Sequence, residues 1–384
     1  MRLKKGKEKR AATGHPWIFS NEIVDSFKAA LPGSLVRVEG ASGRFIGIGY
    51  INPHSLITIR ILAREEEEIN TTFLQKRIEA AHERRSRFYP GRSTYRLCHG
   101  EGDFLPGLVI DKYNEFLVMQ ILTAGMETFR DLIIDLLWRH FKPKGIILRN
   151  DTHFRALEGL PLEKGIVRGE VPKKIPIELY GLKFSVNLSE GQKTGFYLDQ
   201  AENRLAMTNL VKDKKILDTF CYTGAWGLTA LHFGAREVTF VDSSSQALDL
   251  ARESAELNNL ATRCQYHRGD VFDFLKDTSE SYEVIILDPP AFVKSRTRIK
   301  EATAGYIDLN RKAMEKIAPG GILVTSSCSH HISVDLFQQI LLKASQLANR
   351  TVRLLERRTQ AKDHPILFSV PETEYLKCFF LEVI

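Results

Sequence analysis

The 384-residue chain lacks the features that define several classes of protein. Its five cysteines lie far apart with no CxxC pair, which argues against a zinc site or a disulfide framework and favours reduced thiols. No stretch approaches the ~18 apolar residues that a membrane span needs. The basic start MRLKKGKEKR is not followed by the apolar segment of a signal peptide. We therefore expect a cytoplasmic protein with no metal site and no membrane partner.

The length and the net charge of +7 narrow the expectations further. A chain of this length is expected to fold as about two or three domains. The positive charge favours a polyanionic partner, although solubility alone would also account for it. The distribution of the basic residues is therefore more informative than their total.

The pattern of apolar residues changes twice along the chain. Short alternating apolar runs bounded by Gly, Pro or Asn predict a small β-barrel in residues 1–70. Residues 71–175 mix helical periods with strand-like runs, which predicts a small α+β domain, and the acidic run 65–68 is expected to open its first helix. Strands then alternate with helices over 176–384, which predicts an α/β domain with a doubly wound, mostly parallel sheet.

Carboxylates close four successive strands of this predicted sheet: Asp218, Asp242, Asp270 and Asp288. The carboxyl ends of parallel strands form the ligand crevice of open α/β sheets. An acidic residue after the second strand, here Asp242, is where the ribose of an adenosine is usually held, and Asp270 is placed to meet the adenine. A helix N-cap is the simpler interpretation of any one of them, but the ordered series favours a cofactor that contains adenosine.

The loop after the first of these strands carries two glycines, Gly224 and Gly227, just before a helix. Glycines let a ligand approach the backbone, and the helix N-terminus offers free N–H groups. The G-x-G-x-x-G spacing of dinucleotide-binding proteins is absent from 214–235, which weakens a nicotinamide interpretation.

Two further strand ends carry residues suited to covalent chemistry. Asp288 is followed by Pro289 and Pro290, which fix the backbone and force the chain to leave the sheet rigidly. Cys328 follows the fifth strand in SSCSHH, where a neighbouring strand end would bring it across from Asp288. A buried small side chain is the commonest state of a free cysteine, but the polar surroundings favour a nucleophile. Asp288 would then hydrogen-bond to the edge of a pyrimidine.

Five segments resemble the RlmI-like family of ribosomal RNA large-subunit cytosine-5 methyltransferases. They are GQKTGFYLDQ (191–200), LDTFCYTGAWGL (217–228), LDPPAFVKS (287–295), SSCSHHI (326–332) and HPILFSVPETEYLK (364–377). The resemblance runs the whole length. It implies a PUA RNA-binding domain over 1–70, a central α+β domain over 71–175 and a Rossmann-like methyltransferase domain over 176–384.

The resemblance also implies functional roles. Cys328 would be the nucleophile that adds to a cytosine in ribosomal RNA, and S-adenosylmethionine would be the cofactor. Many other RNA cytosine-5 enzymes carry a second cysteine where this chain reads Asp-Pro-Pro, as the RlmI-like family does, so what aids release of the covalent adduct stays open. Together with the strand ends, the residues expected to contact the cofactor are Phe196, Asp199, Gln200, Asp218, Phe220, Tyr222, Gly224, Asp242, Ser243, Asp270 and Pro289.

Besides the basic first ten residues, two segments are candidates for RNA binding, HERRSRFYPGRSTYR at 82–96 and VKSRTRIK at 293–300. Arginine pairs with phosphate and aromatic rings stack on bases, although a solvated helix end would also explain the first segment. The residues expected to bind RNA are Arg84, Arg85, Arg87, Lys294 and Arg296.

Three functions remain in competition. The first is cytosine-5 methylation through Cys328. The second is methylation of an exocyclic amine or a ring nitrogen, which needs no thiol, and the third is a non-catalytic RNA-binding assembly factor. The C-terminal apolar run YLKCFFLEVI is either a core strand or the edge of a homodimer.

Overall fold

The computed structural model describes residues 1–292 and 298–384 and divides the chain into two compact units. Unit 1 comprises Met1–Ile175, Asn187–Leu198 and Lys362–Thr373. Unit 2 comprises Pro176–Val186, Asp199–Ala361 and Glu374–Ile384. The predicted α/β class is confirmed, whereas the domain boundaries at 70 and 175 stay predictions. Over the described ranges, no helix combines the length and the apolar character needed to cross a membrane.

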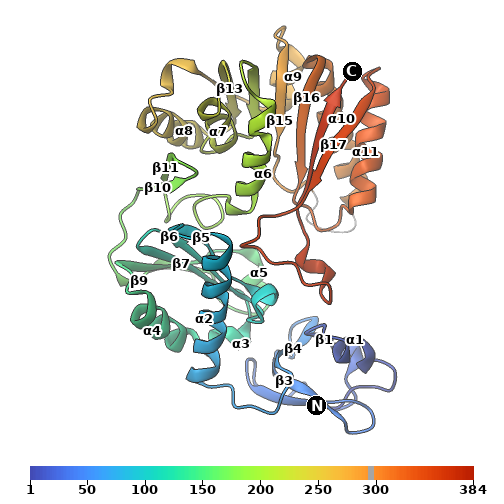
Figure 1. The fold of residues 1–384 in the computed structure, drawn as a ribbon. Coiled ribbons are helices and arrows are strands. Elements are labelled where there is room, and N and C mark those ends of the chain that lie inside the picture. Colours follow the sequence, from blue (N-terminus) through green and yellow to red (C-terminus); the bar gives the residue numbers. More distant parts are fainter. Residues whose placement is uncertain (293–297) are drawn as a thin grey trace. The chain divides into compact units, whose positions relative to one another are not determined.

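The N-terminal part of unit 1 holds a four-stranded antiparallel sheet in the order β1-β4-β3-β2 (Figure 1). Buried isoleucines from three of its strands form a small core with Leu3 and Val38, because their side chains alternate toward one face. The elements of this part are α1 (Glu8–Ala12), β1 (Trp17–Phe19), η1 (Ser20–Glu22), β2 (Leu35–Glu39), β3 (Phe45–Ile51) and β4 (Ile57–Ala63).

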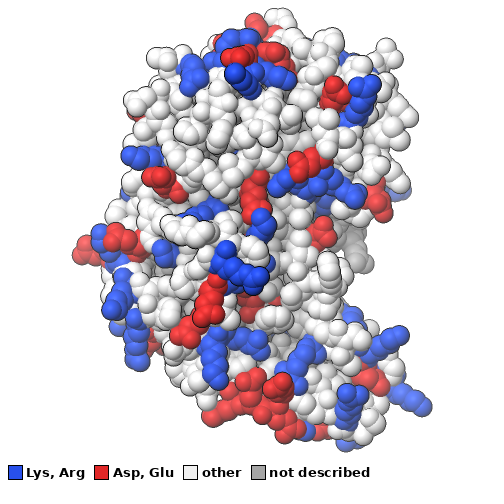
Figure 2. Space-filling model, in the orientation of Figure 1, with Lys and Arg blue, Asp and Glu red and all other residues white. Residues whose placement is uncertain are grey.

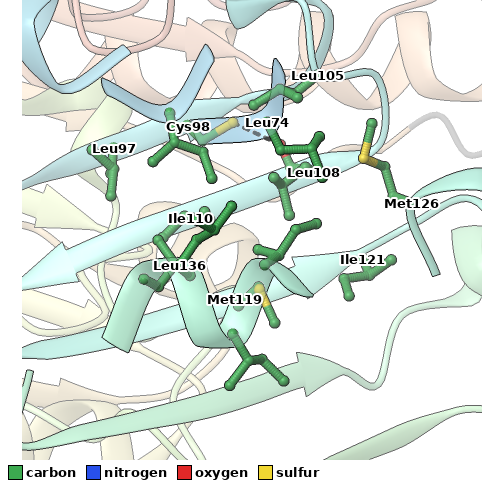
Figure 3. Close-up of a cluster of buried hydrophobic side chains, with 14 of the residues drawn as sticks. Leu74, Leu97, Cys98, Leu105, Leu108, Ile110, Met119, Ile121, Met126 and Leu136 are labelled. Carbon is green, nitrogen blue, oxygen red and sulfur yellow. Dashed lines mark hydrogen bonds between the residues drawn. The ribbon is translucent and has the colours of Figure 1, made fainter. Parts of the chain in front are cut away.

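The rest of unit 1 is built on a five-stranded sheet in the order β5-β6-β7-β8-β9, in which only β7 and β8 run parallel. Leu74 of α2 and Leu136 of α4 pack into its main apolar core (Figure 3). The elements are α2 (Thr71–Phe88), β5 (Thr94–His99), η2 (Gly100–Asp103), β6 (Leu108–Tyr113), β7 (Phe116–Ile121), α3 (Ala124–Glu127), α4 (Arg130–Phe141), β8 (Gly145–Asn150), α5 (His153–Ala156) and β9 (Glu163–Gly169).

The expectation that the acidic run opens α2 is wrong. The helix begins at Thr71, and the N-cap is Asn70, whose side chain accepts a hydrogen bond from the backbone N–H of Phe73. An Asn cap satisfies an N–H group that would otherwise lack a partner, and it therefore decides where the helix starts.

Unit 2 is built on a seven-stranded sheet in the order β14-β13-β12-β15-β16-β18-β17 (Figure 1). The first five strands in this order run parallel, and β18 is antiparallel to both of its neighbours. The strands are β12 (Lys215–Thr219), β13 (Glu237–Asp242), β14 (Cys264–Arg268), β15 (Tyr282–Leu287), β16 (Ile317–Ser327), β17 (Val352–Arg358) and β18 (Lys377–Val383), and a separate hairpin consists of β10 (Ile175–Leu179) and β11 (Leu182–Val186).

The helices of unit 2 connect these strands. Alternation of a strand with an amphipathic helix is what lets the parallel strands be covered on both faces. The helices are α6 (Ala201–Ala206), η4 (Met207–Leu210), α7 (Ala225–His232), α8 (Ser245–Leu257), η5 (Ala261–Arg263), α9 (Val271–Asp277), α10 (Ile299–Lys316) and α11 (Val334–Leu347). Of the two remaining short helices, η3 (Leu198–Gln200) begins on the last residue of a unit 1 segment, and η7 (Pro371–Thr373) belongs to unit 1.

The strand order creates a reversal between β12 and β15. The chain runs outward from β12 through β13 to β14 and then returns to place β15 on the other side of β12. Ligands of open α/β sheets bind at the carboxyl ends of the strands beside such a reversal. The apolar run at the C-terminus forms β18 between β16 and β17, so the interpretation of that run as a dimer edge is wrong.

Candidate active site

Asp288 follows β15 at the strand reversal, and two N–H donors hold its carboxylate. Nε2 of Gln200 donates to Oδ1 at 3.0 Å, and Nε1 of Trp226 donates to Oδ2 at 3.0 Å. Pro289 is buried, as expected for a residue that fixes the exit of the chain from the sheet. With an N–H donor on each oxygen, the local geometry presents Asp288 as a hydrogen-bond acceptor.

Gln200 connects the ends of two neighbouring strands. Besides Asp288, its Nε2 donates to Oγ of Ser326 at 3.1 Å, while its Oε1 accepts from Nδ2 of Asn203 at 2.7 Å. The amide is buried, and its orientation follows from these three bonds. Gln200 therefore positions Asp288 relative to the end of β16.

Cys328 directly follows β16 and is half-buried. The prediction that the fourth and fifth strands are neighbours is confirmed, because β15 and β16 pair in parallel with Leu287 opposite Thr325. The residues on either side of the cysteine are fixed by Tyr306 of α10, whose hydroxyl lies 3.0 Å from Oγ of Ser327 and 3.3 Å from Oγ of Ser329. The thiol is thus carried by a well-anchored loop and is not sealed in the core.

Asp218 lies at the carboxyl end of β12 and is fully buried. Its Oδ2 accepts from the backbone N–H of Gly227 at 2.8 Å, whereas Oδ1 has no hydrogen-bond partner within the described part of the chain. Burial raises its pKa to about 8, and the nearby carboxylates Asp288 and Asp242 act in the same direction. A buried carboxylate oxygen without a partner suits a ligand that brings a positive charge or a donor.

The loop between β12 and α7 has an unusual backbone. Phe220 and Tyr222 have φ values of 52° and 48°, a left-handed region that residues with a side chain seldom adopt. Such conformations persist where the surrounding structure enforces them, and they cluster at ligand-binding sites. The sequence did not reveal this strain.

Local packing accounts for glycine at both positions of this motif, and Gly227 lies within α7, not in the loop before the helix as predicted. Gly224 has a φ of 72° and caps α7. A Cβ on Gly227 would lie 2.4 Å from the Phe240 ring and 2.7 Å from Val238, so glycine is needed there to seat α7 against β13.

The remaining strand-end carboxylates differ in their local roles. Asp242 closes β13 and accepts from the backbone N–H groups of Tyr222 at 3.0 Å and Ser244 at 2.9 Å. Asp270 is exposed and caps α9 through the N–H groups of Phe272 and Asp273. The simpler N-cap interpretation therefore accounts for the Oδ1 atom of Asp270.

The segment that resembles a cofactor-covering motif is split between the two units. Phe196 belongs to unit 1, is buried, and its backbone N–H donates to the Tyr113 hydroxyl at 3.2 Å. Asp199 belongs to unit 2, is buried, and accepts from the Tyr375 hydroxyl at 2.7 Å. Ser243 lies in a different segment, directly after β13, and this predicted cofactor residue is exposed.

Asp218→Asn is expected to change how the stability of the protein depends on pH. Because the folded-state pKa of about 8 lies above that of an aspartate in the unfolded chain, the folded protein holds a proton that the unfolded chain releases. The contribution of Asp218 to stability is therefore full at low pH and falls as pH rises from about 4 to 8. Asparagine does not titrate, and its amide oxygen still accepts from Gly227.

Thermal unfolding at several pH values checks this prediction. We expect the stability of the wild type relative to the variant to fall by ~1–3 kcal/mol between about pH 5 and pH 8. Asp249→Asn on the exposed face of α8 is the control and should leave the pH slope unchanged. Parallel curves for the wild type and Asp218→Asn would contradict the prediction.

Two of the predicted RNA-binding arginines are accessible and one is not. Arg87 is exposed and Arg84 is half-buried, and both lie over the ring of Phe88. Arg85 is fully buried, and its guanidinium forms a two-pronged ion pair with Asp103. The prediction that Arg85 binds RNA is therefore corrected: its side chain is part of the core of unit 1.

The predicted residues Lys294 and Arg296 lie outside the described residues. Elsewhere, basic side chains are dispersed among acidic ones over the face shown in Figure 2. The visible charge distribution does not mark one RNA-binding patch on this face.

Three residues around the strand ends were missed by sequence reasoning. Trp226 stands inside a recognised motif, and its indole N–H was a possible signal for a polar role. Tyr306 and Lys377 are 22 residues before and 49 residues after Cys328 in the chain numbering, so only the fold reveals that they support the cysteine loop. Among residues 1–292 and 298–384, no group of His, Cys, Asp or Glu side chains is arranged to hold a metal ion.

The fold and the residues at these strand ends indicate the class of protein to which the chain belongs. Residues 147–370 match the family described as S-adenosylmethionine-dependent methyltransferase, and residues 1–64 match the PUA-like domain. The carboxylate of Asp242 at the end of β13 and the buried Oδ1 of Asp218, which has no partner among the described residues, fit a cofactor that carries a ribose and positive charge. The chain is thus an S-adenosylmethionine-dependent methyltransferase with an N-terminal PUA-like domain.

Curated relatives narrow the class further. Ribosomal RNA large subunit methyltransferase I of Klebsiella pneumoniae strain 342 is 40% identical over 389 residues, which covers 99% of this chain and 97% of the relative. The protein of the same name from Cronobacter sakazakii is 38% identical, with 99% of this chain and 98% of the relative covered. The chain belongs to the ribosomal RNA large subunit methyltransferase I family.

Solved structures agree on the fold. A chain assigned as an S-adenosylmethionine-dependent methyltransferase from Streptococcus mutans has a TM-score of 0.85 at 23% identity, with 100% of this chain and 99% of that chain covered. A second chain, assigned as a methyltransferase and crystallised with S-adenosylhomocysteine, has a TM-score of 0.87 at 22% identity, with the same coverage.

Proposed function

We propose that this chain methylates carbon 5 of a cytosine in large-subunit ribosomal RNA, with Cys328 as the nucleophile. The names of the curated relatives and the PUA-like domain support an RNA substrate of this kind. The observation that carries the proposal is the parallel pairing of β15 with β16, because it places the segments with Asp288 and Cys328 at one edge of the sheet. A cytoplasmic location and a homodimer stay predictions.

The proposed reaction begins when the Cys328 thiolate adds to carbon 6 of the ring. A C–S bond forms and the electron pair of the 5,6 double bond becomes available at carbon 5, which is otherwise too weak a nucleophile to take a methyl group. S-adenosylmethionine, when bound, supplies an electrophilic methyl group. A base then removes the proton from carbon 5, the double bond forms again, and the C–S bond breaks to return the thiolate.

Asp288 is proposed to orient the pyrimidine. Gln200 and Trp226 hold it as an acceptor, and a carboxylate oxygen can accept more than one hydrogen bond. The exocyclic amino group of cytosine is a donor, whereas uracil presents a carbonyl oxygen at the same position. A fixed acceptor therefore favours cytosine.

The cofactor and RNA contacts are proposals of the same kind. Asp242 would hold the ribose hydroxyls and Asp218 would face positive charge on the cofactor. Arg84, Arg87, Lys294 and Arg296 would contact phosphates. The remaining proposed cofactor contacts are Phe196, Asp199, Gln200, Phe220, Tyr222, Gly224, Ser243, Asp270 and Pro289.

Methylation of unmodified ribosomal RNA in vitro tests the proposed function. Large-subunit RNA made by transcription and the assembled subunit should be offered separately with labelled S-adenosylmethionine, and the nucleosides identified by mass spectrometry. We expect 5-methylcytidine from at least one of the two substrates. A label found only on an exocyclic amine or a ring nitrogen would contradict the proposal.

A further inference from the structure

Lys377 is a buried lysine at the start of β18, beside the loop that carries Cys328. Its backbone is the partner of Ser327 in the antiparallel pairing of β16 with β18. Its side chain is only 4% exposed, and Nζ donates to the carbonyl oxygens of Ser329 at 2.7 Å and Tyr375 at 2.8 Å. The ammonium is therefore anchored to the residue that immediately follows the cysteine.

The charge of this side chain is not balanced by a carboxylate. Within the described residues, no Asp or Glu lies at ion-pair distance from Nζ, and the two carbonyls accept only two of its three N–H groups. A buried charge without a counter-ion is costly, and strongly perturbed titratable groups cluster at functional sites. Burial lowers the pKa of Lys377 to about 8, while Cys328 and Glu374 act against that decrease.

We propose that the Lys377 ammonium is the counter-ion of the Cys328 thiolate, an inference that rests on the proposed role of Cys328 as the nucleophile. The neutral amine takes the proton of the thiol: the S–H bond breaks, an N–H bond forms, and the electron pair stays on sulfur. The net charge of the pair is unchanged, so the step needs no other proton acceptor. Lys377 acts through the sulfur and is a positioning residue.

Other titratable groups surround the same loop. Tyr306 of α10 contacts both flanking serines, and burial raises its pKa further above the neutral range, so it contributes a hydroxyl and no charge to the loop. Glu374 precedes β18 and favours the charged form of Lys377. His330 lies in the loop itself and is exposed, and Asp288 follows the neighbouring strand. Lys377 is the buried cation of this set, so its replacement should change the pKa of the Cys328 thiol more than replacement of any other member.

The pH dependence of thiol alkylation tests the proposal without RNA or cofactor. The full-length protein is treated with iodoacetamide, a neutral reagent, and modification of the Cys328 peptide is followed by mass spectrometry. In Lys377→Met we expect the apparent pKa of Cys328 to rise and its alkylation near neutral pH to slow about tenfold, which corresponds to about one pKa unit. Lys377→Arg keeps the charge and should stay close to the wild type.

Two further variants separate charge from structure. Lys377→Gln keeps N–H donors for the carbonyls but carries no charge. It should therefore raise the apparent pKa of Cys328 as Lys377→Met does, and it provides the test if Lys377→Met folds poorly. Lys343→Met, on the exposed face of α11, is the control and should leave the curve unchanged. A Lys377→Gln protein that is folded by thermal melting and titrates like the wild type overturns the proposal.

This readout is independent of the proposed function. The alkylation curve reports the state of the thiol whether or not Cys328 attacks the substrate. If Cys328→Ala were to keep full methylation while Lys377→Gln shifted the curve, the nucleophile would be wrong and the ion pair right. If instead Cys328→Ala abolished methylation and Lys377→Gln left the curve unchanged, the nucleophile would be right and the ion pair wrong.

Discussion

Replacing Cys328 with alanine is expected to lower the rate of methyl transfer at least ~1000-fold. The reason is chemical, since carbon 5 of cytosine becomes a competent nucleophile only after a thiolate has added to carbon 6. No other part of the proposed machinery supplies that electron pair. Binding of the cofactor should persist, because Cys328 is not among the residues proposed to hold it.

The measurement is single-turnover methylation of ribosomal RNA, with calorimetric titration of S-adenosylhomocysteine as the binding readout. Cys264→Ala is the matched control: this thiol is also half-buried but lies at the start of β14, away from the carboxyl ends of the strands. Its rate should equal that of the wild type. Nearly full activity of Cys328→Ala would instead favour attack by an amine or a ring nitrogen without a covalent intermediate.

Substituted RNA gives the same hypothesis a second test. When fluorine replaces hydrogen at carbon 5 of the target cytosine, no proton can leave and the covalent adduct cannot resolve. We expect a protein–RNA complex that survives denaturing electrophoresis with the wild type and is absent with Cys328→Ala. If both proteins formed the complex equally, another nucleophile would be involved.

The strand-end residues were predictable because one rule places them. Asp218, Asp242 and Asp288 each come at the end of a β-branched, apolar run, and parallel strands that alternate with helices must bring such ends to one edge of the sheet. The neighbouring positions of β15 and β16 followed from the same rule. Asp270 follows its strand in the same way, yet its Oδ1 caps α9. An aspartate between a strand and a helix can serve either as a ligand-binding residue or as a helix N-cap, and the sequence pattern is the same for both.

The supporting residues were not predictable in this way. Lys377 reaches the cysteine loop only because β18 inserts antiparallel between β16 and β17, and no periodicity in the sequence specifies that insertion. Gln200 and Trp226 meet on Asp288 from segments before and after β12. Their roles depend on side-chain distances of about 3 Å, which a linear pattern does not encode.

Arg85 differs from these residues, because the helical spacing in the sequence indicates its burial. The basic composition of the segment led instead to the prediction that it binds RNA. Leu74, Ile78, Ala81 and Arg85 follow one another at spacings of four, three and four residues, which is the repeat of a single helix face. The first three are buried in the core of unit 1, so the fourth must be buried as well. Arg87 lies off this face and is exposed.

Arg85→Ala is therefore expected to destabilise unit 1 by ~3–5 kcal/mol, the usual cost of leaving one partner of a buried ion pair alone. The guanidinium pairs with both oxygens of Asp103 and donates from Nε to the carbonyl of Arg96 at 2.8 Å and from Nη2 to that of Asp363 at 2.6 Å. Truncation leaves a buried carboxylate and two carbonyls without their donor. A drop of roughly 10 °C in the melting temperature is expected for a unit of this size.

Arg87→Ala, two residues away on the exposed face of the same helix, is the matched control. It should have the same melting temperature as the wild type. It should also weaken RNA binding and reduce the slope of log affinity against log salt by about one counter-ion. In an Asp103→Ala background the further loss from Arg85→Ala should be much smaller, because the carboxylate that needs the guanidinium is gone. If Arg85→Ala weakened RNA binding without a loss of stability, the Arg85 side chain would lie on the surface and not in the core of unit 1.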